Sequence, residues 1–179
     1  MRTSNVPLRL AVQCNCGDHA FIDLTKGYVA LVDVADAQSL STYCWCAAPD
    51  KRTVYAARRA RVDGRGRTLR MHQALLPPQP GLQIDHINGC GLDNRRANLR
   101  YCTNAQNQWA QHRVRRNAAS KFKGVQKQPV GWRASIRKNG ELHVLGSFDD
   151  EADAARAYDE AAKEMFGQFA RVNFPGAHG

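Results

Sequence analysis

The sequence predicts an α+β protein built from small antiparallel sheets and a few helices. Three observations support this prediction: short runs of alternating apolar and polar residues, glycine-containing turns between them, and one late segment with helical periodicity. The 179 residues are enough for one large domain or two small ones. We expect a β-rich amino-terminal segment, a central motif, and a three-stranded antiparallel sheet packed on one helix near the carboxyl terminus.

The amino-terminal segment, residues 1–70, is expected to be rich in β-strands. Lys26-Gly27 favours a hairpin turn, and residues 63–66 favour another. A brief helix is expected from Asp33 to Leu40. The expected strands are residues 20–24, 28–32, 53–58 and 68–71. Nothing in this segment carries chemistry that the sequence identifies, so we interpret it as a scaffold.

The central segment contains the most informative residues of the chain. Asp85 and His86 end a predicted short strand and are followed by asparagines at fixed distances, with arginines between them. Side chains alternate faces along a strand, so the pair should point in opposite directions unless the strand ends or bends there. Asn88-Gly89 supplies such a break. Thr103 is a candidate N-cap for a helix that would carry Asn107.

These residue types suit the hydrolysis of a phosphodiester. Asp85 and Asn107 offer hard oxygen atoms, and Mg²⁺ commonly uses few protein ligands beside waters and substrate phosphates. A neutral His86 can take a proton from an attacking water. A divalent cation stabilises the charge that develops on the phosphate. An isolated Asp-His pair is more often an ordinary surface loop, so only the joint pattern favours a nuclease.

The ordered run Asp-His-x-Asn-Gly, Asp-Asn-Arg, Asn-Leu-Arg and Asn resembles the HNH nuclease motif, also called the ββα-metal motif. The resemblance implies a ββα-metal nuclease core at residues 71–112, with His86 as general base and Asp85 as metal ligand. Asn98 matches the middle asparagine, which belongs to the catalytic site and braces the loop between the strands. Asn107 matches the final position, a metal ligand. The implied cofactor is Mg²⁺ or another divalent cation such as Mn²⁺.

The segment that begins at Met71 also resembles the region that precedes the motif in such enzymes. His72 lies in it, and we interpret this histidine as structural rather than catalytic.

The charge of the chain favours a polyanionic partner. Lysine and arginine number 26 against 16 acidic residues, which gives a net charge of +10, and such a field attracts nucleic acid. From Asn94 to Gly140 the sequence has no acidic residue. Charge runs are often only solvated surface, but beside a nuclease-like motif we interpret this one as a DNA track, with Arg95 and Arg100 as contacts. A second basic run contains Arg58, Arg59, Arg61, Arg65 and Arg67.

The third part, residues 120–175, is predicted to form three strands followed by a helix. Alternating apolar and basic residues predict a sheet with one apolar and one positive face, and Asn139-Gly140 is a strong hairpin turn. Asp149 or Asp150 can cap the helix, and Gly167 can end it. Its small alanines would let the helix lie close to the sheet.

This part resembles the plant Apetala/ethylene-response-factor DNA-binding domain. The matching residues are Lys-Gly-Val at 123–125, Trp-Arg-Ala at 132–134, Leu-Gly-Ser-Phe at 145–148, Ala-Ala-Arg-Ala-Tyr-Asp at 154–159 and Val-Asn-Phe-Pro at 172–175. In that family the sheet enters the major groove. The resemblance therefore implies DNA contacts by Lys123, Trp132, Arg133 and Arg137, to which we add Lys127 as a phosphate contact.

Two matching positions leave alternatives open. Trp132 could instead belong to the core, because an aromatic residue on a sheet can fill either role. Gln126 stands where the family usually has arginine, so the base preference of the plant proteins does not transfer.

Six cysteines allow another kind of site. The Cys-x-Cys pairs at 14–16 and 44–46 could form a thiolate zinc site, with His19 as a further ligand. Their spacing differs from the usual gap of two to four residues. An intracellular setting also disfavours disulfides. We therefore expect buried or incidental thiols rather than structural zinc.

Together these patterns predict a Mg²⁺-dependent HNH endonuclease for double-stranded DNA, of the homing type found in phages or mobile elements. A basic linker at 113–119 would join the nuclease to the carboxyl-terminal DNA-binding domain. We expect a monomer without membrane association, located in the cytoplasm of the cell or of a phage host, since there is no long apolar stretch or signal-peptide core. The main alternative is a catalytically inactive, sequence-specific DNA-binding regulator, and a weaker one is a zinc-dependent binding module.

Overall fold

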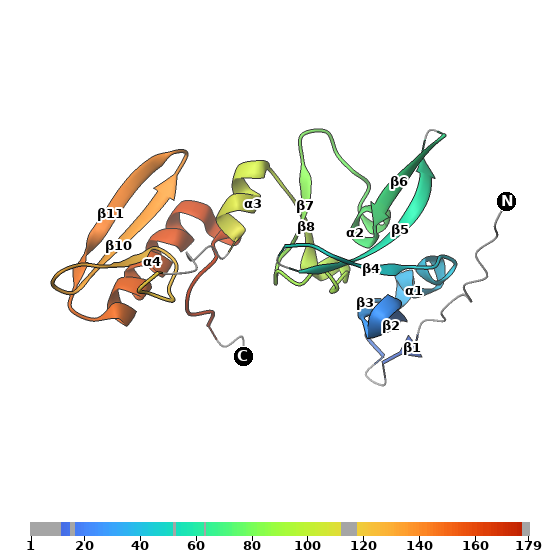
Figure 1. Cartoon of the computed structure of the whole chain (residues 1–179), viewed down its shortest axis with the longest axis horizontal. Coiled ribbons are helices and arrows are strands. Elements are labelled where there is room, and N and C mark those ends of the chain that lie inside the picture. The colour runs from blue at the N-terminus through green and yellow to red at the C-terminus, as the bar shows by residue number, and fades with distance from the viewer. Residues whose placement is uncertain (1–11, 15–16, 52, 63, 112–117, 177–179) are drawn as a thin grey trace. The chain divides into compact units, whose positions relative to one another are not determined.

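A computed structural model describes residues 12–14, 17–51, 53–62, 64–111 and 118–176. The chain divides into two compact units, Met1–Cys102 and Thr103–Gly179 (Figure 1). Both units combine small antiparallel sheets with few helices, which confirms the α+β class. No helix in the described part of the chain is long and apolar enough to cross a membrane.

The amino-terminal unit contains three small antiparallel sheets. Their strand orders are β1-β2-β3, β4-β5-β6 and β7-β8. The elements in chain order are β1 (Val12–Gln13), β2 (His19–Asp23), η1 (Thr25–Gly27), β3 (Val29–Asp33), α1 (Val34–Ser41), β4 (Cys46–Pro49), β5 (Val54–Val62), β6 (Arg65–Arg70), α2 (Met71–Leu75), β7 (Gln83–His86), η2 (Arg96–Asn98) and β8 (Leu99–Cys102).

One apolar cluster joins these sheets and helices. It includes Val32 of β3, Trp45 before β4, Met71 of α2 and Leu99 of β8, all nearly inaccessible to solvent. Burying each large apolar side chain contributes about 1.5–3 kcal/mol. Because Leu99 belongs to this cluster, the β7–β8 hairpin is anchored in the same core as the amino-terminal strands.

Local signals in this unit placed the turns well. Lys26 and Gly27 adopt positive φ angles of 60° and 74° between β2 and β3, at the predicted hairpin. The predicted brief helix is α1. The β5–β6 turn is tighter than expected, because β5 continues to Val62 and β6 starts at Arg65.

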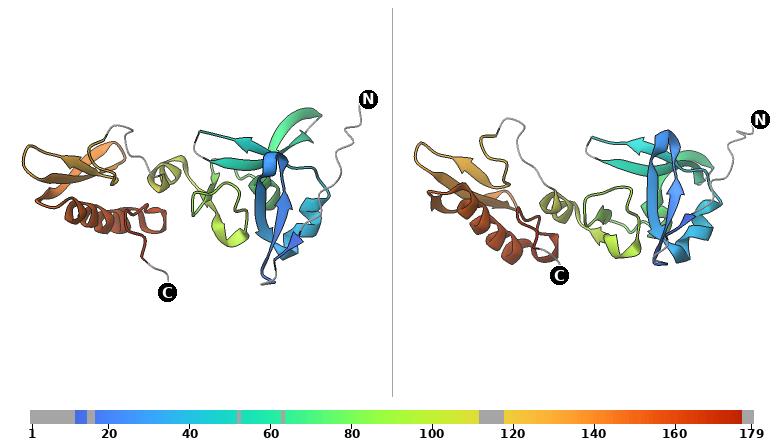
Figure 2. Two further views of the ribbon diagram at one scale, coloured as in Figure 1. Left: turned by 60° about the horizontal axis from the view of Figure 1, so that its bottom comes forward. Right: turned by 90° about the horizontal axis from the view of Figure 1, so that it is seen from below.

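The carboxyl-terminal unit is a three-stranded sheet, in the order β11-β10-β9, covered on one face by a long helix (Figure 2). Its elements are α3 (Asn104–Ala110), β9 (Val125–Lys127), β10 (Trp132–Lys138), β11 (Glu141–Phe148), α4 (Glu151–Phe166) and η3 (Gly167–Phe169). Asn139 and Gly140 have positive φ angles of 50° and 91°, as the predicted hairpin turn requires.

Small residues bring α4 close to the sheet. Ala154, Ala155 and Ala162 are fully buried against β9, β10 and β11. Asp150 caps the helix by accepting hydrogen bonds from the backbone amides of residues 152 and 153. Gly124, in the Lys-Gly-Val match, is required because a Cβ there would overlap the ring of Tyr158.

A buried carboxylate fastens the end of the chain to α4. Asp159 accepts hydrogen bonds from the backbone amides of Asn173, at 2.7 Å, and Phe174, at 2.8 Å. The side chain of Asn173 in turn accepts from the backbone amide of Lys123 at 2.7 Å. These contacts explain why the two matching runs at 154–159 and 172–175 occur together.

The division between the units falls earlier than residue 112, where the expected nuclease domain ended. The helix α3 belongs to the carboxyl-terminal unit. There Trp109 stacks on Phe166, with ring centroids 4.7 Å apart, and the backbone carbonyl of Trp109 accepts a 2.6 Å hydrogen bond from Lys123 Nζ. Most of the predicted linker, residues 113–117, lies outside the described residues.

Candidate nuclease site and DNA-facing sheet

The β7–β8 hairpin presents the two central residues of the motif. The register pairs Asp85 with Arg100 and His86 with Leu99. Strand alternation sends the two side chains to opposite faces. Asp85 contacts Arg100, whereas His86 contacts a buried ring cluster. The strand forms as predicted, but it continues through His86, so the Asn88-Gly89 break comes after both residues and their side chains point apart.

Asn98 holds the loop that joins the two strands, residues 87–98, which we call the site loop. Its Nδ2 donates to the carbonyl of Asp93 at 2.8 Å and to Oδ1 of Asn88 at 3.0 Å. Its Oδ1 accepts from the backbone amide of Asn88 at 3.0 Å. Because Asn98 is buried, losing these bonds would leave unpaired groups, each at a cost of about 1–3 kcal/mol.

The site loop is also bonded to the middle of β3. The amide of Leu31 donates to the carbonyl of Leu92 at 2.8 Å, and the carbonyl of Leu31 accepts from the amide of Asn94 at 2.7 Å. Close packing continues at Gly91, where a Cβ would lie 2.7 Å from the ring of Tyr55 and from the carbonyl of Val54. The amino-terminal scaffold therefore sets the conformation of the site loop.

His86 lies in a cluster of three aromatic rings. Its ring centroid is 5.0 Å from that of His72 and 5.8 Å from that of Tyr55. Burial lowers the pKa of His86, against the opposing effects of the Asn94 amide and the Asp85 carboxylate. Burial also lowers the pKa of His72 to about 3. Both rings are therefore neutral at physiological pH, the state that a general base must have.

Two buried polar atoms near this cluster have unused hydrogen-bonding capacity. Within the described part of the chain, Nε2 of His86 and Oδ1 of Asn94 have no hydrogen-bond partner. The Asn94 amide nevertheless lies close enough to favour the charged form of His86. Buried polar atoms are usually paired, and exceptions are typical of catalytic groups or of groups that meet a bound ion or water.

Asp85 is held by an ion pair across the hairpin. Arg100 donates to Oδ2 of Asp85 from Nε at 3.0 Å and from Nη2 at 2.8 Å. The side chains are 14% and 13% exposed, so the pair is partly shielded from water. A cation that binds Asp85 must therefore share this carboxylate with Arg100 or displace the guanidinium.

A hard divalent cation fits the donors of the motif. Asp85 and Asn107 offer oxygen atoms rather than thiolates, as such a cation prefers. Asp93 is already engaged: burial would raise its pKa, but hydrogen bonds from Arg95 and Asn88 outweigh this and lower it. Among the described residues, no three or more His, Cys, Asp or Glu side chains are placed so that they could hold a metal ion together. A cation held here would thus keep waters or phosphate oxygens as further ligands.

Asn107 lies on α3, in the carboxyl-terminal unit. The helix begins as predicted, with Thr103 as N-cap and a reciprocal capping box with Gln106. The relative positions of the two units are not determined (Figure 1), so the structure does not bring Asn107 and Asp85 together.

The cysteines lie apart from this arrangement. Cys44, Cys46 and Cys90 are exposed, Cys14 is half-buried and Cys102 is buried. Cys16, which the zinc alternative needs, lies outside the described residues.

The predicted DNA contacts of the carboxyl-terminal sheet fall into two groups. Arg133 and Arg137 lie on the face opposite α4, where Arg133 Nη2 donates to Gln126 Oε1 at 2.7 Å. Trp132 is partly buried and packs against the core cluster that includes Ala154 and Ala155 of α4, and its contact with DNA stays a prediction. Lys127 places its Nζ 4.4 Å from the centroid of the Trp132 ring, on that same side of the sheet.

Lys123 is also occupied within its own unit, because its ammonium donates to the Trp109 carbonyl. The sequence could not separate these lysines from the outward-facing arginines, because their contacts with Trp109 of α3 and Trp132 of β10 exist only in the folded unit.

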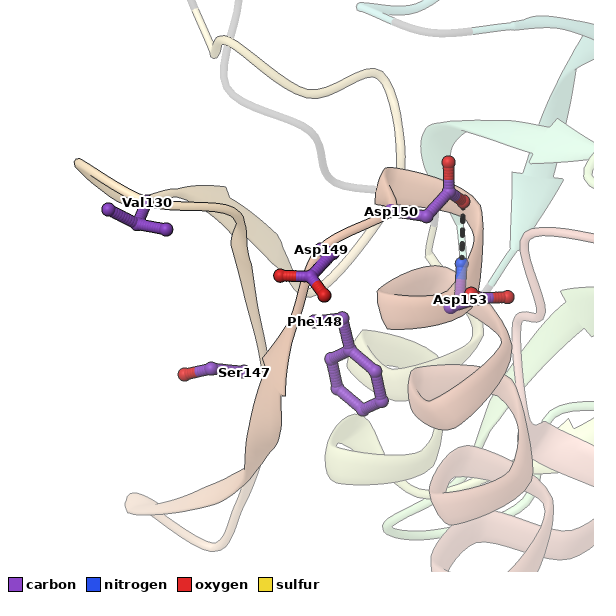
Figure 3. A pocket seen from close by; sticks show the side chains of 6 residues that line it. All are labelled: Val130, Ser147, Phe148, Asp149, Asp150 and Asp153. Carbon is purple, nitrogen blue, oxygen red and sulfur yellow. Dashed lines mark hydrogen bonds between the residues drawn. The ribbon is translucent and has the colours of Figure 1, made fainter.

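A pocket of about 480 Å³ lies where β11 meets the start of α4 (Figure 3). Three of its lining residues are acidic: Asp149, Asp150 and Asp153. Asp150 accepts a 3.2 Å hydrogen bond from the amide of Asp153 as part of the helix cap. Such a surface repels phosphates, so the pocket does not belong with the predicted DNA contacts.

Some residues of the site were not singled out from the sequence. The Asn94 amide lies close to the His86 side chain, and the ring of Tyr55 packs against the ring of His86. Asn94 had a signal, since it lies in the Asp-Asn-Arg part of the motif. Tyr55 had none, because only the fold brings β5 to β7.

Residues 76–109 match a family model described as HNH endonuclease. The matched range contains Asp85, His86, Asn98 and Asn107 together. The resemblance to HNH endonucleases is confirmed. The match crosses the division between the two units, so α3 belongs to the motif by sequence.

Relatives support both parts of the chain. An uncharacterized HNH endonuclease of Acanthamoeba polyphaga mimivirus is 36% identical over 93 residues, covering 51% of this chain and 47% of that protein. A separate region matches plant proteins. Dehydration-responsive element-binding protein 2A of Arabidopsis thaliana is 47% identical over 62 residues, 33% of this chain and 18% of the plant protein. An AP2/ERF and B3 domain-containing protein of Oryza sativa subsp. japonica is 50% identical over 60 residues, 33% of this chain and 16% of that protein.

These relatives bear out the predicted pairing of an HNH endonuclease with a DNA-binding domain of the plant type. The chain spans about half or less of the length of each of them. No solved structure matches the chain significantly.

Proposed function

We propose that the protein is a divalent-metal-dependent endonuclease that hydrolyses phosphodiester bonds in double-stranded DNA. One observation supports this most strongly: His86 is buried, neutral and next to Asp85 on a hairpin whose loop Asn98 braces. A neutral histidine and an oxygen donor, here consecutive residues of one strand, are the two groups that metal-assisted hydrolysis requires.

The residues have separate roles in this proposal. His86 takes the proton from the attacking water, and Asn98 keeps the site loop in place. Asp85 and Asn107 would hold the cation, which when bound stabilises the negative charge on the phosphate and on the leaving oxygen. Arg100 neutralises Asp85 when the carboxylate holds no cation, and together with Arg95 it can contact phosphates once DNA is bound.

The carboxyl-terminal sheet would supply much of the sequence preference. Arg133 and Arg137 are the proposed base contacts, because they lie on the face away from α4. Lys127 is a proposed phosphate contact at the edge of the sheet. Lys123 and Trp132 would act indirectly, by fixing the position of the sheet on its helix and on α3.

Finer features follow from the resemblance. We propose Mg²⁺ as the physiological cation, with Mn²⁺ able to replace it, and a monomer that acts inside the cell. The pairing of a nuclease with a separate DNA-binding domain suits a homing-type enzyme of a phage or other mobile element.

The test is cleavage of supercoiled plasmid with Mg²⁺ by the wild-type protein and by His86→Ala. General acid–base catalysis contributes about 10²–10⁴ in rate, so the variant should lose about that factor while still binding DNA. His19→Ala, which alters a histidine outside the motif, is the matched control. Wild-type cleavage rates in His86→Ala would overturn the assignment of the base.

The Asp85–Arg100 ion pair favours one alternative, a DNA-binding regulator without nuclease activity. If Arg100 neither shares the carboxylate nor leaves it, Asp85 does not bind a cation. Wild-type protein that binds DNA but leaves plasmid intact with both Mg²⁺ and Mn²⁺ would support the regulator.

A further inference from the structure

The outer half of the β5–β6 hairpin extends beyond its sheet as a two-stranded ribbon (Figure 1). The strand β4 pairs only with residues 54–57 of β5. Within the described part of the chain, β5 from Arg58 to Val62 pairs only with residues 65–69 of β6. We call residues 58–69 the arginine ribbon, because its described strands carry Arg58, Arg59, Arg61, Arg65 and Arg67.

The strand register puts arginines on both faces of this ribbon. Arg59 and Arg61 lie on one face, opposite Thr68 and Gly66. Arg65 and Arg67 lie on the other face, opposite Val62 and Ala60. Residues directly opposite in an antiparallel pair share a face, so each face carries two positive side chains from a single strand.

These four arginines differ in their partners from five other arginines of the chain that form ion pairs. Among the described residues, ion pairs are made by Arg70, Arg95, Arg96, Arg100 and Arg156. None involves the ribbon, where Arg59, Arg61, Arg65 and Arg67 are exposed. The only acidic residue of the ribbon sequence is Asp63, which lies outside the described residues. The positive charge of the ribbon therefore remains available to a partner.

The base of the ribbon is held firmly. The guanidinium of Arg58 lies 3.8 Å from the ring centroid of Tyr43 and 5.5 Å from that of Trp45. Trp45 is itself buried and donates to the carbonyl of Leu40 at 2.8 Å. Arg58 therefore anchors the ribbon to the core, and the four exposed arginines project from an ordered base.

We propose that the arginine ribbon lies in a groove of double-stranded DNA, where the arginines of its two faces contact phosphates on both walls. The major groove is about 12 Å wide and accepts a two-stranded β-ribbon. Arginine binds phosphate oxygens through paired N–H groups. Ala60, Gly64 and Gly66 keep the ribbon slim. This contact rests on the proposed function, since it uses the same DNA, but it adds a surface in the amino-terminal unit to that of the carboxyl-terminal sheet.

The test compares three full-length proteins: wild type, Arg59→Ala/Arg61→Ala/Arg65→Ala/Arg67→Ala, and the matching fourfold Arg→Lys variant. The binding of a fluorescent random-sequence duplex is measured across a range of KCl concentrations without divalent metal, so that cleavage does not intervene. Each phosphate contact contributes about 0.9 to the slope of log affinity against log salt. The alanine variant should therefore lose about 3–4 from the magnitude of the slope, and the lysine variant should keep it. Circular dichroism checks that all three proteins fold.

The possible outcomes separate this inference from the proposed function. An unchanged slope in a folded alanine variant, with wild-type plasmid cleavage intact, would overturn the ribbon contact and leave the nuclease standing. A reduced slope in the alanine variant, together with a wild-type protein that does not cleave plasmid, would support the ribbon contact and overturn the proposed nuclease. If the alanine variant changed sedimentation but not the slope, the ribbon would belong to self-association, and the DNA contact would be rejected.

Discussion

The β7–β8 and β10–β11 hairpins are both antiparallel pairs, but they place their polar side chains in opposite environments. On β7–β8, His86 is buried and Asp85 is covered by Arg100, and each is fixed by neighbours from several elements. On β10–β11, Arg137 is exposed on the sheet face opposite α4. Hydrolysis needs groups that are fixed and dry before substrate arrives, whereas recognition needs groups that water still reaches. The difference indicates where a substitution should affect rate and where it should affect affinity.

The largest effect is expected on the buried side of this comparison. Asp85→Ala, and separately Asn107→Ala, should reduce Mg²⁺-supported cleavage to the detection limit, because a cation with few protein ligands loses one of them. DNA binding should remain. Mn²⁺ binding followed by electron paramagnetic resonance, without DNA, would report the lost ligand independently of activity.

Two further variants sharpen that experiment. Asn98→Ala should lower cleavage through the site loop while changing Mn²⁺ affinity much less, and Asp23→Ala, an exposed carboxylate on β2, should change neither quantity. Normal cleavage and normal Mn²⁺ binding by Asp85→Ala would mean that another residue holds the cation.

An intermediate effect is expected on stability, and only in the amino-terminal unit. The pKa of His72 is about 3 in the folded chain and 6.5 ordinarily, so the unfolded chain binds a proton that the folded chain does not. The contribution of His72 to stability is therefore full above about pH 6.5 and falls as the pH drops toward 3, by up to about 5 kcal/mol.

Scanning calorimetry from neutral pH down to about pH 4 checks this window. His72→Gln should flatten the pH dependence of the first unit, and the transition of the second unit should not change. An equally steep pH dependence in His72→Gln would assign it to other groups, of which buried His86 is the first candidate.

The smallest effect is expected on the exposed side. Arg133→Ala should cost about 1–3 kcal/mol of DNA binding and relax the preference at one base position, with little change in cleavage rate at saturating DNA. Binding-site selection from a random library measures the preference. Arg156→Ala is the matched control, since this residue forms an exposed ion pair with Asp153 on α4. Equal losses of affinity in both variants would show that the effect is general charge rather than base contact.

Local signals predicted the elements well, because their causes are local. Asn139-Gly140 forces a hairpin turn, Thr103 and Asp150 cap helices, and strand alternation separates Asp85 from His86. Each of these depends on neighbours within a few residues. The order of the motif residues could also be predicted from the sequence, and the matched range 76–109 contains all of them.

Long-range contacts account for what the sequence did not predict. Trp109 stacks on Phe166, and this contact places α3 in the carboxyl-terminal unit. The engagement of Lys123 with Trp109 and the packing of Trp132 against α4 likewise depend on the assembled unit. Tyr55 reaches His86 only because β5 and β7 meet in the fold. No spacing rule predicts contacts between segments so far apart in the chain.

The two hydrogen bonds from Leu31 to the site loop have a consequence for how such a motif can be moved between proteins. A strand far upstream of the matched range 76–109 supplies backbone partners to Leu92 and Asn94. The matched range alone would therefore carry all the named chemical groups and still lack the template that shapes them. A recombined protein that receives the motif must therefore also receive β3. Otherwise another strand must offer a backbone amide and carbonyl to Leu92 and Asn94. In this protein the template of the site loop lies in the amino-terminal fold, outside the matched range.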